Sequence, residues 1–307
     1  MAVFLSVCLL TYKRNHLLRK LMVELCKEGI QDWEVVVVDT SGSGAAREVL
    51  EEYSASSDLS VKAIHPAERL SISGGRNRAL DEAAGEWILF MDDDQILSGE
   101  VVRIVIERLK EKGGQIFAAR LGVQTEFSEE KSGAFYESKL RKSGYYGASE
   151  SGRETMKACH LSTDGVVFRK PPEEMRFLEK LGYTGGEDND FFARYLGDQD
   201  CEIWNDITIT DLVMADRIKV GYIMRDSYRK GCSYAQLQAE RLGQSRSTLF
   251  IKYLRDSAGS ICLFLVDVIL WRDWPKSLGL MARQWGKISG LFGRRYALYR
   301  NGNTNVS

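Results

Sequence analysis

The sequence predicts an α/β fold in which a mostly parallel sheet carries helices on both faces, followed by a helical extension. Two observations predict it. Apolar runs of strand length alternate with helix-periodic segments through the first 120 residues, which is the order of a parallel sheet. The run at 87–91 also ends directly in Asp92, Asp93 and Asp94, and open α/β sheets place their ligands at the carboxyl ends of such strands.

Each expected element has its own local signal. Runs of apolar, β-forming residues predict strands at 3–10, 33–38, 60–65 and 87–91. Apolar residues that recur every three or four positions predict helices at 16–26, 45–53 and 73–84. Together these segments give three strand–helix units followed by a fourth strand.

The second part of the chain is less regular. Between 121 and 158, Gly, Ser and Tyr mix with charged residues, which predicts a long mobile excursion over a site. Strand character returns at 163–169. Gly185 and Gly186 then give the backbone room for a sharp turn, and a helix is expected at 190–196.

Composition excludes several classes of protein. The 307 residues are 44% hydrophobic and 28% charged, as in ordinary globular proteins, and the net charge of −1 gives no sign of nucleic-acid binding. Six cysteines without CxxC or metal spacing predict reduced thiols in a cytoplasmic protein. The first residues lack the basic segment of a signal peptide and predict a strand instead.

The charge is uneven along the chain. Residues 245–307 carry ten Lys/Arg and three Asp/Glu, a net charge of +7, which leaves −8 for residues 1–244. Tryptophans alternate with basic residues there, and the longest apolar run is interrupted by Asp267 and falls short of the ~20 residues of a membrane span. This pattern suits peripheral contact with an anionic membrane at the inner face. The alternatives are a helical cap on the rest of the chain and an oligomer contact.

Two acidic clusters are candidates for chemistry. Like charges at the end of a buried strand need a compensating partner, and a hard divalent cation, Mn²⁺ or Mg²⁺, suits oxygen ligands. The alternative is a solvated acidic turn. The second cluster, Glu187 and Asp188, follows the two glycines; it suits a catalytic base, or simply a helix first turn stabilised by the dipole. The three histidines, His16, His65 and His160, are expected on the surface or in packing.

Five motifs resemble those of a known family. In chain order they are Val-Cys-Leu-Leu-Thr-Tyr-Lys-Arg, Val-Val-Val-Val-Asp-Thr-Ser-Gly, Gly-Gly-Arg-Asn-Arg-Ala-Leu, Gly-Glu-Trp-Ile-Leu-Phe-Met-Asp-Asp-Asp and Gly-Gly-Glu-Asp-Asn-Asp-Phe. Over roughly residues 1–235 the sequence resembles a family-2 glycosyltransferase of the GT-A fold. Its Gly-Gly-Glu-Asp segment also resembles the acceptor-side motif of β-1,4-galactosyltransferases.

The resemblance implies an inverting, metal-dependent transfer from a nucleoside-diphosphate sugar, expected to be a UDP-sugar. The acceptor would be a hydroxyl group of a glycan, a lipid-linked sugar or a small molecule. The resemblance also implies a GT-A domain at 1–240, with a half at 1–120 that binds the nucleotide sugar and a half at 121–240 that binds the acceptor. Residues 241–307 would form a basic, aromatic-rich helical extension.

On the donor side the resemblance implies contacts to the nucleotide sugar. These positions are Thr11, Tyr12, Arg14, Asp39, Arg76, Asn77, Asp92 and Asp93. Asp92 and Asp94 are the outer members of a DxD motif and would contact the ribose and the metal-bound diphosphate. Asp211 lies where many relatives carry a metal-binding histidine, so Asp94, Asp92 and Asp211 are the implied metal ligands.

On the acceptor side the resemblance implies that Asp188 is the catalytic base and that Glu187 lies beside it. The helix dipole is expected to hold the pKa of Asp188 low, which favours the ionised base. Glu187 is expected to point elsewhere, because adjacent residues do not share a helix face, and to hydrogen-bond the acceptor.

Two other functions compete with this interpretation. A sugar-nucleotide nucleotidyltransferase also uses metal-binding carboxylates, but its glycine-rich loop with a basic end is absent after the first strand, where Thr-Tyr-Lys-Arg-Asn stands. A non-catalytic sugar-binding protein of the same fold is the third hypothesis. The retained Asp92, Asp94, Glu187 and Asp188 argue against it. The sequence names neither the donor sugar, the acceptor nor the linkage.

Overall fold

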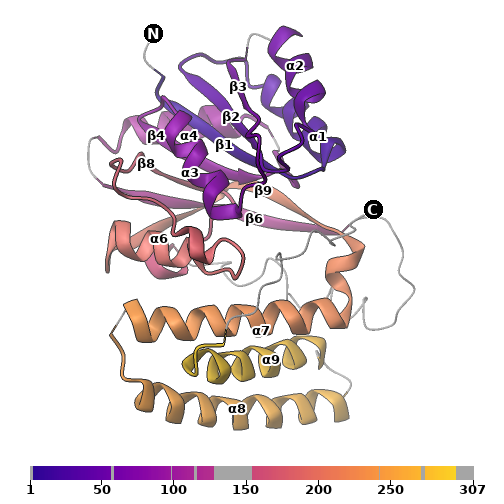
Figure 1. Cartoon of the computed structure of the whole chain (residues 1–307), viewed down its shortest axis with the longest axis vertical. Helices are drawn as coiled ribbons and strands as arrows, with labels where there is room; N and C mark the ends of the chain where they lie inside the picture. The colour runs from indigo at the N-terminus through magenta and orange to yellow at the C-terminus, as the bar shows by residue number, and fades with distance from the viewer. Residues whose placement is uncertain are drawn as a thin grey trace. The chain divides into compact units, whose positions relative to one another are not determined.

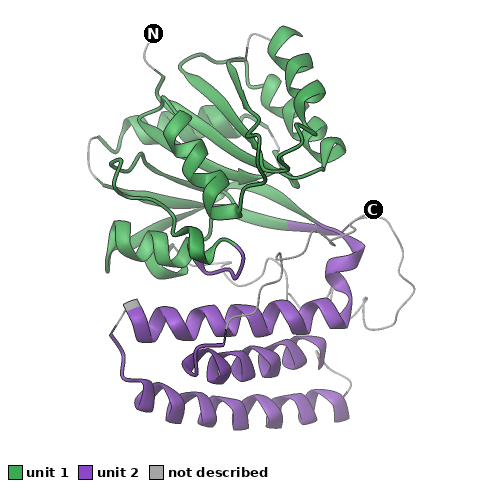
Figure 2. Cartoon of the chain, in the orientation of Figure 1, with its two compact units in different colours: residues 1–124, 151–182, 187–212 green, residues 125–150, 183–186, 213–307 purple. Residues whose placement is uncertain are grey.

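The computed structural model describes residues 3–56, 59–97, 99–113, 116–127, 154–241, 243–270 and 274–294. The chain divides into two compact units (Figure 2). Unit 1 comprises residues 1–124, 151–182 and 187–212, and unit 2 comprises residues 125–150, 183–186 and 213–307. Each unit has its own architecture.

Unit 1 begins with the parallel half of its sheet (Figure 1). The strands are β1 (Leu5–Thr11), β2 (Trp33–Asp39), β3 (Val61–Ile64) and β4 (Trp87–Asp92), in the spatial order β3-β2-β1-β4. The helices between them are α1 (Asn15–Cys26), α2 (Arg47–Ser56) and α3 (Ile72–Glu82). These seven elements confirm the strands and helices predicted for the first 92 residues.

Beyond β4 the sheet changes direction. The order continues β4-β8-β6-β9-β5, with β7 paired to β9, and the pairs β4–β8, β6–β8, β5–β9 and β7–β9 are antiparallel. The strands are β5 (Gln95–Leu97), β6 (Ala118–Phe127), β7 (Thr155–Lys157), β8 (Val166–Arg169) and β9 (Asp200–Val213). The remaining helical elements of this unit are α4 (Val101–Lys110), η1 (Ala158–His160), η2 (Glu179–Leu181) and α6 (Glu187–Leu196).

The excursion expected at 121–158 is wrong at both of its described ends, because residues 121–127 belong to β6 and residues 155–157 form β7. Strand β6 pairs with β8 through residues 118–120 and lies next to β9 in the sheet order, so its later residues join the sheet although their own sequence pattern is weak. Residues 128–153 of the excursion lie outside the described residues. The helix expected at 190–196 begins three residues earlier, at Glu187, so both predicted acceptor-side carboxylates lie in its first turn.

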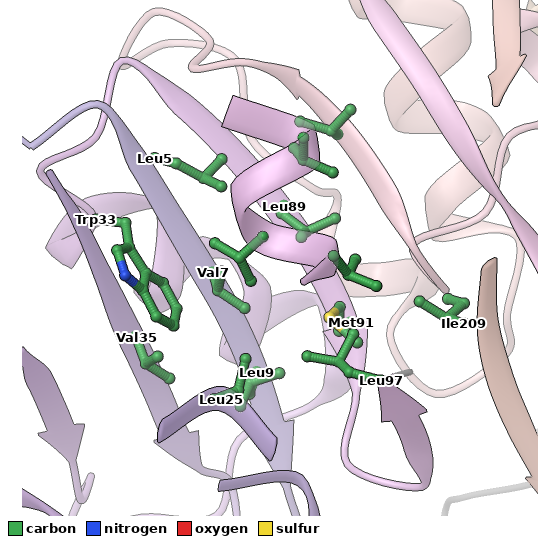
Figure 3. Packing of buried hydrophobic residues seen from close by; sticks show 14 of the residues in the cluster. Leu5, Val7, Leu9, Leu25, Trp33, Val35, Leu89, Met91, Leu97 and Ile209 are labelled. Atoms are coloured by element: carbon green, nitrogen blue, oxygen red, sulfur yellow. The ribbon is translucent and has the colours of Figure 1, made fainter. Parts of the chain in front are cut away.

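Helices cover both faces of the sheet. On one face, residues of α1, α2 and α4 pack against alternate residues of the strands, among them Leu5, Val35 and Leu89 (Figure 3). On the other face, α3 and α6 pack against the intervening residues, such as Cys8 and Phe90. Strands buried on both faces need continuous apolar sequence, which explains why the four valines of β2 are all buried.

Unit 2 is mainly helical. Its elements are η3 (Ala215–Ile218), α7 (Val220–Gln236), a π-helical turn at Leu237–Arg241, α8 (Arg246–Ile269) and α9 (Trp274–Leu291). Within the unit, α9 packs against both α7 and α8 (Figure 1). The unit therefore includes α7, which precedes residue 241, where the sequence places the start of the helical extension. Among the described residues, no helix is both long and apolar enough to cross a membrane.

Candidate active site

The loop after β1 supplies a cation to the aspartate cluster. The Thr11 hydroxyl donates a hydrogen bond to Asp93 Oδ2 at 2.8 Å. Arg14 Nη1 donates to Asp93 Oδ1 and to Asp94 Oδ2, each at 3.2 Å. Lys13 turns the chain sharply with φ 55°, which brings Arg14 back over the strand ends. The protein thus compensates two of the three aspartates with its own guanidinium group.

The aspartates lie where three strands meet. Asp92 ends β4, and its backbone N–H donates to the side-chain oxygen of Gln95 at 3.0 Å. The Leu212 N–H donates to the Asp94 carbonyl oxygen at 3.1 Å, and Gln95 is the register partner of Asp211. The β5–β9 pair therefore brings the backbone of Asp211 to the same edge of the sheet as the DxD segment.

Burial disfavours the ionised forms of Asp92 and Asp93. Burial, followed by the neighbouring Asp94 carboxylate, raises the pKa of Asp92 well above its usual range, although Arg76 opposes the rise. Burial also raises the pKa of Asp93, against the opposing effect of Arg14. A further positive charge at Asp92 would favour its ionised form.

The donor set fits a hard cation, although it does not form a complete cage. In the described part of the chain, no three or more His, Cys, Asp or Glu side chains are grouped so that they could hold a metal ion. The implied three-ligand set of Asp92, Asp94 and Asp211 is therefore not assembled. Mg²⁺ sites of this kind use one or two carboxylates together with substrate phosphates, and the half-buried Asp92 and the buried Asp94, two positions apart in the chain, meet that requirement.

Asp39 lies at the end of β2, next to the end of β1. Its two oxygens accept hydrogen bonds from the backbone N–H groups of Ser41 and Ala46, both at 2.9 Å. Burial raises the pKa of Asp39, but these hydrogen bonds outweigh burial, and the net shift is downward. The Arg69 guanidinium lies over the Tyr12 ring, 5.0 Å from its centroid. An ionised carboxylate and an aromatic ring therefore flank the carboxyl ends of two neighbouring strands.

Helix α3 directs Arg76 toward the acceptor-side carboxylates. Arg76 is buried, and its Nη1 atom donates to Glu187 Oε1 at 2.9 Å and also to Asp188 Oδ1. The Asn77 amide group donates to the Phe177 carbonyl at 2.9 Å and accepts from the Phe177 N–H at 2.8 Å. Asn77 therefore clamps the segment that carries Phe177, and the Phe177 ring lies under the Arg76 guanidinium.

Two expectations about the start of α6 are wrong. Glu187 does not point away from Asp188, because both carboxylates converge on Arg76 at the helix N-terminus, where side chains of successive residues reach past the first turn. The pKa of Asp188 is not low. Burial raises it to about 7, Glu187 and Asp164 add to the rise, and Arg76 opposes it. Loss of solvation outweighs the helix dipole here.

Two residues beside Asp188, Thr163 and Asp164, were not predicted from the sequence. The Thr163 N–H and hydroxyl both donate to Asp188 Oδ2 at 3.4 Å. Asp164 accepts hydrogen bonds from Arg120, at 3.1 Å, and from Ser162, and it raises the pKa of both Asp92 and Asp188. The one available signal was the polar Thr-Asp-Gly run directly before β8.

The two glycines before α6 have backbone conformations that side chains disfavour. Gly185 and Gly186 have φ of 81° and 87°. A Cβ atom at Gly185 would overlap the Arg229 guanidinium, and one at Gly186 would lie 2.8 Å from the Ser233 Cβ. Ser233 also donates a hydrogen bond to the Gly185 carbonyl at 3.0 Å. Both positions therefore require glycine, as the sharp turn predicted.

Residues 6–174, more than half of the chain, match the profile of the family described as glycosyl transferase family 2. The chain belongs to glycosyl transferase family 2. The matched range contains the ends of β1, β2 and β4 and the Thr163–Asp164 segment. By its description, this family consists of glycosyl transferases.

Named relatives include enzymes of glycan assembly. The chain is 26% identical over 113 residues to the GalNAc(5)-diNAcBac-PP-undecaprenol beta-1,3-glucosyltransferase of Campylobacter jejuni. The matched segment covers 37% of each protein. The chain is 25% identical over 245 residues to the succinoglycan biosynthesis protein ExoM of Rhizobium meliloti, covering 77% of this chain and 75% of ExoM. The first match thus spans little more than a third of that relative's length.

Solved structures show the same GT-A-like fold. The mannosyltransferase PcManGT of Pyrobaculum calidifontis, in complex with GDP-Man and Mn²⁺, superposes with a TM-score of 0.59 at 14% identity, covering 94% of this chain and 87% of that one. Residues 1–349 of Staphylococcus aureus TarS with UDP-GlcNAc give a TM-score of 0.52 at 14% identity, covering 95% and 93%. These likenesses confirm the predicted fold class.

Proposed function

We propose that this glycosyltransferase moves a sugar from a UDP-sugar to an acceptor hydroxyl group in a single inverting displacement that depends on a divalent metal. One observation carries the proposal: buried Arg76 binds Glu187 and Asp188 and acts electrostatically on Asp92. One residue thereby links a carboxylate suited to metal and diphosphate with a carboxylate suited to proton removal.

The donor half of the proposal rests on the strand ends. Thr11, Tyr12 and Asp39 would receive the nucleoside, and Arg14 would lie beside the diphosphate, because its guanidinium already binds Asp93 and Asp94. Asn77 contributes indirectly, since its amide holds the Phe177 backbone. Structures of fold relatives with UDP-GlcNAc and with GDP-Man support a nucleotide sugar as donor.

Asp92 and Asp94 would hold Mn²⁺ or Mg²⁺ together with the donor phosphates, and Asp211 is the third candidate ligand. When bound, the cation would neutralise charge that develops on the departing nucleoside diphosphate. Arg14 contributes positive charge to the same region. The complex of PcManGT with Mn²⁺ supports a metal in a protein of this fold.

The acceptor half rests on the first turn of α6. Asp188 would accept the proton of the attacking hydroxyl group while Thr163 and Arg76 hold its two oxygens. Glu187 uses Oε1 for Arg76, and its buried Oε2 has no hydrogen-bond partner among the described residues. That oxygen can accept a hydrogen bond from the acceptor sugar, so Glu187 would orient the acceptor and Asp188 would act as base.

The acceptor is proposed to be a glycan or a lipid-linked sugar. The names of the Campylobacter and Rhizobium relatives support this choice, since one names an undecaprenol-linked substrate and the other succinoglycan biosynthesis. We also propose that the enzyme is cytoplasmic and that residues 245–307 contact the inner face of the membrane peripherally.

Donor binding tests the proposal without knowledge of the acceptor. UDP, GDP and a set of their sugar conjugates are added with Mn²⁺, and the melting temperature is recorded. A ligand at 100 times its Kd should stabilise the protein by about 2.7 kcal/mol. Excess chelator or Asp94→Ala should remove the UDP-dependent shift and leave the melting temperature of the free protein nearly unchanged. An equal UDP-dependent shift in chelator would contradict metal-assisted donor binding.

A further inference from the structure

Helix α8 has its apolar side chains on the outside. Nine of the sixteen large exposed hydrophobic residues in the described chain lie between 251 and 270. They are Ile251, Leu254, Ile261, Leu263, Leu265, Val266, Val268, Ile269 and Leu270. Ile251 and Ile269 are 69% and 73% exposed. An ordinary surface helix turns such residues toward the core.

The buried side of α8 is apolar near its start, at Leu249 and Tyr253, and comparatively polar toward its C-terminal end. Asp267 is buried and accepts a hydrogen bond from the Ser277 hydroxyl of α9. Ser260 is also buried and donates to the Ser257 carbonyl at 2.9 Å. The C-terminal half of α8 therefore buries a carboxylate and hydroxyl groups while it exposes Leu, Ile and Val, the reverse of a water-soluble helix.

The neighbouring helices pack through small residues. A Cβ at Gly286 of α9 would overlap the Tyr228 carbonyl oxygen of α7, and a Cβ at Gly290 would lie 2.5 Å from the Cys232 carbonyl oxygen. Gly286 and Gly290 are four residues apart, so they lie on one helix face. Close backbone contact through small residues holds helices together without large apolar side chains between them, which leaves such side chains for the outside.

The exposed charged side chains of α8, α9 and their described flanking residues are all positive. Within 243–270 and 274–294, the exposed charged residues are all basic: Arg246, Lys252, Arg255, Lys276, Arg283 and Arg294. The two acids of these ranges, Asp256 and Asp267, are less exposed. Trp285, 66% exposed, adds an amphipathic ring of the kind found at membrane–water boundaries.

We infer that the outward face of α8, from Ile251 to Leu270, docks on a bilayer that contains anionic phospholipid. Exposed Leu, Ile and Val would enter the boundary between headgroups and acyl chains, and the basic residues would meet the phosphate groups. The inference extends the proposed function, on which its biological meaning rests, because it assigns the surface that would hold the enzyme beside a lipid-linked acceptor.

The positive charge of the outward face of α8 and the width of its apolar surface favour a bilayer over a second copy of the chain as its partner. Two copies of this face would bring Lys252 and Arg255 of each against basic residues of the other, whereas anionic lipid complements them. A two-helix seam also needs only a narrow apolar stripe. Here exposed apolar residues occupy successive positions, Leu265–Val266 and Val268–Leu270, and so cover most of the outward circumference of the helix end.

The test is co-sedimentation of the full-length protein with vesicles. Vesicles of phosphatidylcholine with phosphatidylglycerol are compared with vesicles of phosphatidylcholine alone, at low and high salt. The test variant is Ile251→Gln/Leu265→Gln/Ile269→Gln. Its matched control, Val23→Gln/Ile104→Gln/Ile116→Gln, changes three exposed apolar residues of unit 1. The UDP-dependent melting shift of every protein shows separately whether the donor site is intact.

Wild type and control should bind the anionic vesicles, with weaker binding at high salt. The test variant should lose at least about tenfold in partitioning while it keeps its UDP-dependent shift. Three outcomes would overturn the inference: wild type that ignores anionic vesicles, a test variant that binds as well as wild type, or a wild-type oligomer that the test variant converts to monomer without any vesicle binding. Absence of the UDP shift in wild type would contradict the proposed function alone.

A second readout does not depend on the test variant. Cys262 lies exposed in α8, whereas Cys8, Cys201 and Cys232 are buried. In a Cys26→Ser/Cys159→Ser background, a polarity-sensitive fluorophore on Cys262 should shift to shorter wavelength when anionic vesicles are added. If the labelled protein sediments with the vesicles but its emission spectrum is unchanged, another surface binds the lipid.

Discussion

Arg76 is the residue on which the candidate site depends most. It is buried, it binds both carboxylates of the α6 first turn, and its charge reaches Asp92. A buried guanidinium group needs anionic partners, and buried carboxylates need a cation. Arg76 therefore favours the ionised form of Asp188, whereas the neighbouring Glu187 disfavours it, and loss of Arg76 would raise the pKa of Asp188 further.

The proposed base is tested by Asp188→Asn, which keeps the shape of the side chain and removes its basic oxygen. The transfer rate should fall about 10²–10⁴-fold, the usual loss for a general base. UDP affinity should barely change, because the donor contacts lie on other segments. Glu187→Gln serves as the matched control and should mainly raise the KM for the acceptor. Near-normal turnover of Asp188→Asn together with an inactive Glu187→Gln would reverse the two roles.

The raised pKa of Asp188 predicts the pH dependence of the reaction. The ionised carboxylate is the active form, so kcat/KM should rise with pH and level off above about 7. The same shift favours the protonated folded state. Its contribution to stability is therefore complete below the ordinary value of 3.8 and is lost as pH rises through about 7. A rate profile that is already flat at pH 5 would contradict the assignment.

At the scale of elements, local sequence predicts only what local interactions determine. The apolar runs of β1, β2 and β4 are buried on both faces, so their sequences identify them as strands. The antiparallel strand β6 carries a weaker pattern, partly exposed toward its end. It becomes a strand through its pairing with β8, which is more than forty positions distant in the chain, and no local signal reports that pairing.

The same limit explains what was missed in the candidate site. The Asp92–Asp94 run and the Glu187–Asp188 pair are visible in the sequence because their members are adjacent. The Arg14–Asp94 and Arg76–Asp188 ion pairs join residues 80 and 112 positions apart, and Thr163 reaches Asp188 from another strand end. The pKa of Asp188 depends on burial and on Arg76, Glu187, Asp164 and Thr163, so it could not be judged from the helix dipole alone.

Helix packing in unit 2 is tested by Gly286→Ala. The added methyl group would overlap the Tyr228 carbonyl oxygen, so α7 and α9 must move apart. We expect a loss of about 1–3 kcal/mol in the free energy of unfolding, measured by denaturant titration. Gly259→Ala is the matched control: it lies in α8 with no atom within 4 Å of the new Cβ, and it should stabilise by about 0.5–1 kcal/mol. Equal effects of the two changes would contradict close α7–α9 packing.

For the molecule as a whole, one edge of the sheet brings together acidic and basic side chains. The ends of β1, β2 and β4 supply carboxylates with Arg14, and the start of α6 supplies carboxylates with Arg76. Unit 2 adds helix α8, which exposes many of its apolar residues. Together these groups support the proposal that a sugar is transferred in one displacement, with Asp188 as base.

Proton NMR of the transfer reaction tests the single displacement, because it reports the anomeric configuration of the product. The UDP-sugar that gives the largest melting shift is mixed with Mn²⁺ and a panel of aryl glycosides and short polyprenyl-diphosphate sugars, and the anomeric proton of the product is followed. We expect an α-linked donor to yield a β-linked product as UDP is released, and Asp188→Asn to yield almost none. An α-linked product, or an unimpaired rate in Asp188→Asn, would contradict the proposal.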